Sequence, residues 1–247
     1  MSCVVIIPAR MASSRLPGKP LADIAGVPMI VRVWRKAVES ALGPVVVAAA
    51  EVEIAATITQ QGGVAVLTNP ELPSGTDRVF AALQVVDAGC KYDVVVNLQG
   101  DLPLLDPAYL HTVERTLASS MADIATLAAP IENEDDFDNP NVVKPVVAWS
   151  DGSSPGRALY FTRGRAPFGA GPLYHHIGIY AFRRPALSRF VALPPSWLER
   201  RENLEQLRAL EAGMSIAVGR VDAVPLSVDT PADLARARAA ASSQPAR

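Results

Sequence analysis

Short apolar runs alternate with amphipathic segments along the first half of the chain. Runs rich in valine and isoleucine, such as residues 4–7 and 45–48, are typical of strands buried on both faces of a parallel sheet. Between such runs, apolar residues recur three and four positions apart, as they do in amphipathic helices. This alternation predicts an α/β fold with a mostly parallel, Rossmann-like sheet and helices on both faces.

The same patterns give the bounds of the expected elements. Helices are predicted over residues 29–41, 52–61, 79–88, 107–119 and 198–212, with a last helix starting at Pro231. Strands are predicted over residues 45–48, 64–67, 93–98, 142–149, 158–161, 176–182 and 216–221, and an exposed loop over 157–173. We expect a single domain over 1–247, with an inserted subregion at about 130–200 and a flexible tail over 240–247.

Composition restricts the classes of partner. The chain has 247 residues and a formal net charge of −2, so no global basic field favours nucleic acid or an anionic membrane. Its apolar runs are far shorter than the ~20 residues of a membrane span, and no basic leader precedes the first of them. Cys3 and Cys90 fit no metal or redox spacing, which predicts reduced thiols and a cytoplasmic protein.

Three cations follow the first predicted strand. Arg10, Arg15 and Lys19 lie where the carboxyl end of a strand in an open α/β sheet meets its ligand. The loop has neither the glycine spacing of a dinucleotide-binding turn nor that of a Walker loop. Although basic loops are usually just solvated, three prolines stiffen this one. The loop therefore predicts a site for an anion such as a triphosphate.

A carboxylate is predicted at the same edge of the sheet. Asp101 follows the strand that ends in residues 97–100, and a carboxylate facing a triphosphate needs a cation between them. Mg²⁺ commonly bridges one or two carboxylates to phosphate oxygens. Asp229 is a second candidate ligand, although an aspartate before a helix is often a cap and Asp101 alone could be a turn residue.

The remaining candidates have ordinary structural explanations when each is read alone. Residues 74–78 (SGTDR) offer hydroxyls and amides at a helix start, which suit phosphate or ribose but also describe a plain N-cap. His176 and Tyr180 share one face of a strand by its period of two. Arg163, Glu205 and Gln206 would ordinarily be surface residues.

Taken together, these motifs resemble those of the 3-deoxy-manno-octulosonate cytidylyltransferases, the CMP-Kdo synthetases, over nearly the whole chain. The N-terminal loop alone indicates only a sugar nucleotidyltransferase. The motifs that carry the resemblance are IPAR (7–10), SRLPGKPL (14–21), SGTDR (74–78), NLQGD (97–101), NPNVVK (139–144), ALYF (158–161), HIGIY (176–180), LEQLR (204–208) and VDTP (228–231).

The resemblance implies a nucleotide-diphospho-sugar transferase fold, a homodimer, and Mg²⁺-dependent transfer of CMP from CTP to 3-deoxy-manno-octulosonate (Kdo) for lipopolysaccharide. It implies that the inserted subregion serves sugar binding and dimerisation. The nucleotide-binding residues it implies are Arg10, Arg15, Lys19, Ser74, Gly75, Thr76, Asp77, Arg78 and Gln99. Asp101 and Asp229 would ligate Mg²⁺, with Arg10, Lys19 and Asp101 catalytic. The sugar would contact Arg163, His176, Tyr180, Glu205 and Gln206.

Two departures from the family pattern accompany this resemblance. Leu102 stands where the family commonly has Glu, and residues 48–51 read AAAE where it often has Ala-Thr-Asp. Alternatives are a cytidylyltransferase for sialic acid or an amino analogue of Kdo (8-amino-Kdo), and a non-catalytic nucleotide-binding protein. A glycosyltransferase would normally show Asp-x-Asp where Gln99-Gly100-Asp101 stands.

Overall fold

The computed structural model describes residues 1–13, 15–149 and 154–242, and this part of the chain divides into two compact units. The terminal unit consists of Ser2–Leu110 and the chain from Pro225 onward. The central unit consists of His111–Val224 together with Met1. The prediction of one domain with an insert at about 130–200 stays a prediction.

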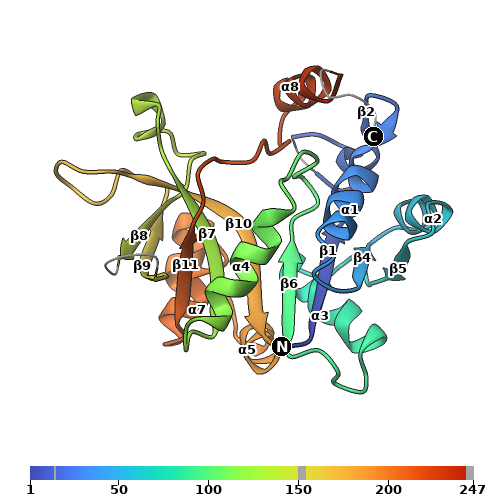
Figure 1. The fold of residues 1–247 in the computed structure, drawn as a ribbon, viewed down its shortest axis with the longest axis horizontal. Helices are drawn as coiled ribbons and strands as arrows, with labels where there is room; N and C mark the ends of the chain where they lie inside the picture. Colours follow the sequence, from blue (N-terminus) through green and yellow to red (C-terminus); the bar gives the residue numbers. More distant parts are fainter. Residues whose placement is uncertain (14, 150–153, 243–247) are drawn as a thin grey trace. The chain divides into compact units, whose positions relative to one another are not determined.

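The terminal unit contains an all-parallel sheet with strand order β5-β4-β1-β6 (Figure 1). Its strands are β1 (Cys3–Ala9), β4 (Val45–Ala49), β5 (Val64–Leu67) and β6 (Val94–Leu98). Its helices are α1 (Met29–Glu39), α2 (Val52–Gln60), α3 (Gly75–Val86) and α8 (Pro231–Ser242), and α4 (Ala108–Ala118) runs on into the central unit. Every residue of β1 and β6 is buried, as their continuous apolar runs predict.

A small hairpin near the N-terminus was not predicted. β2 (Asp23–Ile24) pairs antiparallel with β3 (Val27–Pro28), after a 3-10 turn at Lys19–Leu21. Ile24 of the hairpin packs with Met29, Val228 and Leu234 in one buried cluster. This cluster holds the loop that bears Lys19 and the segment before α8 in the same unit.

The central unit has a mixed sheet with strand order β10-β7-β11-β9-β8 (Figure 1). β7 and β11 are parallel, whereas the pairs β10–β7, β11–β9 and β8–β9 are antiparallel. Its strands are β7 (Ile124–Pro130), β8 (Lys144–Ala148), β9 (Gly156–Thr162), β10 (Tyr174–Arg183) and β11 (Ile216–Arg220). Its helices are α5 (Arg184–Ala192), α6 (Trp197–Glu202) and α7 (Leu207–Glu211), with a 3-10 turn at Glu134–Asp136.

The α/β prediction is confirmed, and the mostly parallel sheet is found in the terminal unit. The single helix predicted over 198–212 is wrong: Asn203 adopts φ 53°, ends α6, and leaves α7 as a separate helix. The loop predicted over 157–173 overlaps β9, which continues to Thr162. Strand β7 and helix α5 were not predicted at all.

Two further sequence predictions concern the ends and the cysteines. Residues 240–242 of the predicted tail are helical in α8, and residues 243–247 lie outside the described residues. Cys3 is buried, Cys90 is exposed, and both are thiols outside any disulfide, as predicted. Within the ranges that the structure describes, each helix is too short or too polar to cross a bilayer.

Candidate functional site

Three charged side chains from distant parts of the sequence meet in the terminal unit. Lys19 Nζ lies 2.9 Å from Asp101 Oδ2 and 3.0 Å from Asp229 Oδ1, and donates a hydrogen bond to each. The Lys19 side chain is only 14% exposed. Burial alone would lower the pKa of Lys19, but the two carboxylates outweigh it and raise that pKa above its ordinary value. We call these three residues the ion cluster.

The backbone around α8 leaves Asp229 available for the ion cluster. Thr230, rather than Asp229, caps the helix: its Oγ1 accepts from Asp233 N, and the Asp233 carboxylate accepts from both Asp229 N and Thr230 N. Burial would raise the pKa of Asp233, but hydrogen bonds from Thr230 and Arg236 hold it at about 2. The capping explanation for Asp229 therefore does not apply to its side chain.

The other two cations of the N-terminal loop are more exposed. Arg15 Nη2 lies 3.3 Å from Asp229 Oδ1, with 57% of its side chain exposed. Arg10 is exposed as well. Glu51, one of the departures from the family pattern, accepts a 2.9 Å hydrogen bond from Met11 N and so anchors the start of this loop.

The turn over residues 74–78 forms the start of α3. Ser74 caps the helix by accepting from Asp77 N, and its hydroxyl donates to the Asp77 carboxylate at 2.6 Å. A Cβ on Gly75 would lie 3.4 Å from Pro8 Cγ and 3.8 Å from Gln99 Oε1. Gly75 and Gln99, both predicted nucleotide contacts, thus lie side by side at the end of β1.

A polar chain connects this turn to β6. Asn97 Nδ2 donates to Thr76 Oγ1 at 3.3 Å, and Gln99 Nε2 donates to Asn97 Oδ1 at 3.1 Å. Asn97 is fully buried within β6. It was missing from the predicted site residues, although an asparagine in an otherwise apolar strand is itself a signal of a polar contact.

Arg78 differs from the rest of its predicted group. Its guanidinium is buried and donates to Thr68 Oγ1 at 2.6 Å and to the backbone oxygens of Asn69 and Pro70. Burial lowers its pKa from the usual arginine value. The structure gives Arg78 a role in holding the 68–70 loop and does not bring it into the ion cluster.

The central unit brings together two of the predicted sugar contacts. His176 Nε2 lies 3.0 Å from Thr126 Oγ1, and its ring meets Phe161 edge-on and Tyr180 at a tilt, at centroid distances of 5.0 and 5.5 Å. Burial lowers the pKa of His176 to about 3, so the ring is neutral near pH 7. Thr126 belongs to β7, the strand that was not predicted, and was missed with it.

Glu205 and Gln206 lie at the break between α6 and α7. Burial, together with the nearby charge of Glu205, raises the pKa of Tyr180 far above its usual value. The Gln206 side chain is buried, and its Nε2 has no hydrogen-bond partner among the described residues. A buried amide of this kind is costly unless a ligand or water satisfies it.

The Arg163 side chain is held by backbone carbonyl groups. Its guanidinium donates to the carbonyl oxygens of Pro140, Glu202 and Asn203 at 2.8, 2.8 and 3.3 Å. The fully buried Lys144 donates to the Arg163 carbonyl from the other side. Arg163 thus connects the end of β9 to the break before Glu205, and the structure does not group it with His176 and Tyr180.

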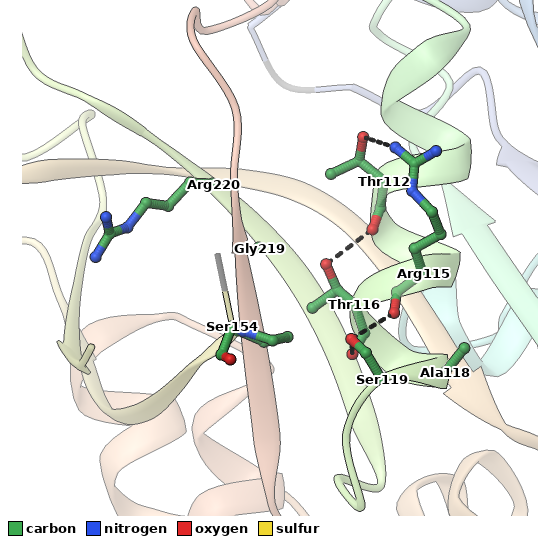
Figure 2. Close-up of a pocket in the computed structure, with 9 residues that line it drawn as sticks. Thr112, Arg115, Thr116, Ala118, Ser119, Ser154, Gly219 and Arg220 are labelled. Carbon is green, nitrogen blue, oxygen red and sulfur yellow. Dashed lines mark hydrogen bonds between the residues drawn. The ribbon is translucent and has the colours of Figure 1, made fainter. Parts of the chain in front are cut away.

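A separate hollow of about 640 Å³ lies in the central unit, and none of the predicted site residues lines it. Figure 2 shows Thr112 and Thr116 on α4 and Ser119 directly after it, with Gly219 and Arg220 on β11. Both Thr116 and Ser119 donate to carbonyl oxygens one turn earlier in α4. Arg220 stacks over Trp149 at 4.2 Å.

Comparison with known proteins agrees with the family named from the motifs. A cytidylyltransferase family model matches residues 4–216. The 3-deoxy-manno-octulosonate cytidylyltransferase of Parvibaculum lavamentivorans is 63% identical, covering 96% of this chain and 92% of its own. Its counterpart in Rhodospirillum rubrum is 59% identical, covering 96% and 94%.

A solved structure extends the agreement to the fold. It is of CMP:2-keto-3-deoxy-manno-octonic acid synthetase complexed with CTP, and it matches with a TM-score of 0.88 and 37% identity, covering 98% of this chain and 99% of its own. The predicted resemblance is therefore confirmed. The chain belongs to the cytidylyltransferase family, within the group of 3-deoxy-manno-octulosonate cytidylyltransferases.

Proposed function

We propose that this protein transfers CMP from CTP to Kdo, releasing pyrophosphate and supplying CMP-Kdo for lipopolysaccharide. The ion cluster is the observation that carries the chemistry, since Lys19 and two carboxylates converge at the end of the N-terminal loop. The relatives named above are cytidylyltransferases for this sugar, and the solved neighbour binds CTP. A sialic acid or 8-amino-Kdo cytidylyltransferase is not favoured by these relatives.

The nucleotide is assigned to the terminal unit. Arg10, Arg15 and Lys19 hold the triphosphate, with Ser74 to Asp77 and Gln99 nearer the nucleoside, and Arg78 supports the 68–70 loop. The anomeric hydroxyl of Kdo attacks the α-phosphorus and forms a new P–O bond, its proton passes to solvent, and the bond from the α-phosphorus to the α,β-bridging oxygen breaks, so that pyrophosphate leaves. Lys19 and Arg10 offset the negative charge that builds on the phosphates.

Mg²⁺ is the proposed cofactor, held by Asp101 and Asp229. The donor set fits, because both carboxylates converge on one ammonium, and Mg²⁺ needs only one or two carboxylates besides phosphate and water oxygens. No group of three metal-ligating side chains exists among the described residues, as a dedicated protein cage would require. When bound, Mg²⁺ neutralises phosphate charge and lowers the pKa of the attacking hydroxyl.

The sugar is assigned to Tyr180, His176, Glu205 and Gln206 of the central unit. The unpartnered Nε2 of Gln206 supports this assignment, because a sugar oxygen would supply its missing acceptor. A neutral His176, held by Thr126, offers hydrogen bonding without charge. Arg163 contributes by fixing the backbone before Glu205. We also propose a cytoplasmic homodimer.

The test is pyrophosphate release with CTP, Mg²⁺ and Kdo, run beside UTP in place of CTP and sialic acid in place of Kdo. We expect release with CTP and Kdo only. Pyrophosphate release with another acidic sugar but not with Kdo would show that the protein is a cytidylyltransferase with a different sugar substrate. CTP binding without release from any sugar would contradict the enzymatic proposal.

A further inference from the structure

The carboxylates of the ion cluster are already neutralised by the chain's own cations. Lys19 Nζ donates to both Asp101 and Asp229, and Arg15 lies 3.3 Å from the same Asp229 oxygen. Two negative and two positive side chains therefore balance. Of the two cations, Lys19 is the more buried, with 14% of its side chain exposed against 57% for Arg15.

This arrangement conflicts with a second cation at the same carboxylates. A divalent ion ligated to Asp101 and Asp229 would bind beside the oxygens that now accept from Lys19, close to its ammonium. Two cations within a few ångströms repel each other strongly in a partly buried setting. Solvent screens the charge of the exposed Arg15, which shares Asp229, so the more buried Lys19 is the cation that competes with the ion for both carboxylates.

We propose that Lys19 is the resident cation of the Asp101–Asp229 pair in the nucleotide-free protein, and that it leaves only when a triphosphate accepts its ammonium. This inference rests on the proposed function for its second step. A lysine suits the exchange because its ammonium is a point charge on a flexible stem, able to turn from one partner to another. Nucleotide and divalent cation then bind with positive coupling, each raising the affinity for the other.

The experiment titrates Mn²⁺ into the full-length, nucleotide-free protein and follows free Mn²⁺ by electron paramagnetic resonance. The variants are Lys19→Met and the control Lys36→Met, which removes a half-buried lysine that pairs with Glu39. We expect Lys19→Met to bind Mn²⁺ on the order of tenfold more tightly than wild type, within the roughly 5- to 150-fold range usual for coupled sites. Lys36→Met should bind as wild type does.

The gain must come from the ion cluster. Adding Asp229→Asn to Lys19→Met should abolish it. Mn²⁺ should also raise the unfolding temperature of Lys19→Met more than that of wild type, because the loss of the ammonium leaves Asp101 and Asp229 with one fewer compensating positive charge. Should Lys19→Met fail to fold, Lys19→Gln keeps hydrogen-bond donors without the charge and gives the same comparison.

Mn²⁺ affinity in Lys19→Met or Lys19→Gln that equals or falls below that of wild type would overturn the proposal, since the ammonium would then not compete with the ion. The wild-type turnover assay is independent of this result. Tighter Mn²⁺ binding by the variant without wild-type turnover would retain the resident lysine and reject the proposed function. Wild-type turnover without tighter Mn²⁺ binding by the variant would retain the proposed function and reject the resident lysine.

Discussion

The ion cluster of the terminal unit differs from the predicted sugar contacts His176, Tyr180 and Gln206 of the central unit, which we call the polar cluster, in how the polar groups are satisfied. In the ion cluster every charge has an opposite charge within 3.3 Å, and Asp229 keeps 40% of its side chain exposed. In the polar cluster, His176 is held by its ring contacts with Phe161 and Tyr180 and by Thr126, whereas the Gln206 amide nitrogen has no hydrogen-bond partner in the part of the chain that the structure describes.

The difference follows from the cost of burying each kind of group. An unpaired buried charge is far more expensive than an unpaired buried amide, which costs about 1–3 kcal/mol. Charged ligand-binding groups must therefore find partners when the ligand is absent, and they exchange partners when it binds. Neutral groups can stay unpaired in a fixed position until the ligand binds. The polar cluster is therefore preorganised for its ligand, whereas the ion cluster must rearrange.

The largest expected effect comes from breaking the ion cluster on its acidic side. Asp101→Asn keeps the shape of the side chain but removes the charge that faces Lys19, and we expect turnover with CTP and Kdo to fall at least about 100-fold. The control is Asp222→Asn, which neutralises an exposed aspartate. Near-normal turnover of Asp101→Asn, with normal circular dichroism, would remove Asp101 from the proposed chemistry.

The residues of the ion cluster could be predicted from the sequence because each follows or precedes a strongly patterned element. A buried strand ending at Leu98 and a helix starting at Pro231 fix the ends at which Asp101 and Asp229 lie. The sequence pattern does not predict the contact between Lys19 and Asp229, whose positions are 210 residues apart. That contact depends on the packing of Ile24 against α8, and the short hairpin that supplies Ile24 carries no periodic signal.

The polar cluster was harder to predict for a local reason. Strand β7 has a nearly unbroken apolar sequence, which periodicity alone does not distinguish from a buried helix. Because β7 was not predicted, Thr126, which contacts His176, was not predicted either. The break at Asn203 was missed because the flanking residues are good helix formers, and only the left-handed backbone of Asn203 ends α6.

The second prediction asks how tightly the central unit is packed. A Cβ on Gly219 would lie 2.3 Å from Thr116 Oγ1 and 3.0 Å from Leu127 Cδ2, so β11 approaches α4 more closely than a side chain allows. Gly219→Ala should lower the free energy of unfolding by about 1–3 kcal/mol, as overpacking does. Urea unfolding followed by circular dichroism measures it. In a Thr116→Ala background the loss should shrink, and an unchanged loss would place the strain elsewhere.

The third prediction separates ligand binding from folding in the polar cluster. Gln206→Met removes the unpartnered amide while keeping an unbranched side chain, so it should stabilise the ligand-free protein by about 1 kcal/mol. The same change should raise the KM for Kdo about tenfold, since one 1.4 kcal/mol contact is worth that factor, and leave the KM for CTP unchanged. Gln84→Met, on an exposed position of α3, is the control. A destabilised Gln206→Met protein would show that the amide has a structural partner.

The last prediction concerns the pH dependence of stability and isolates the neutral character of His176. Its pKa is lowered from 6.5 to about 3 by burial, so between these values the unfolded chain binds a proton that the folded chain does not. Stability should therefore be fully present above about pH 6.5 and fall as the pH drops toward 3. His176→Phe should flatten this dependence because it removes the titrating ring. The variant should still fold, since Thr126 Oγ1 also donates to the backbone oxygens of Ile177 and Ile179. The measurement is urea unfolding at several pH values; a wild-type slope that persists in His176→Phe would assign the proton uptake to other groups, and the contrast with the charged ion cluster would lose its support.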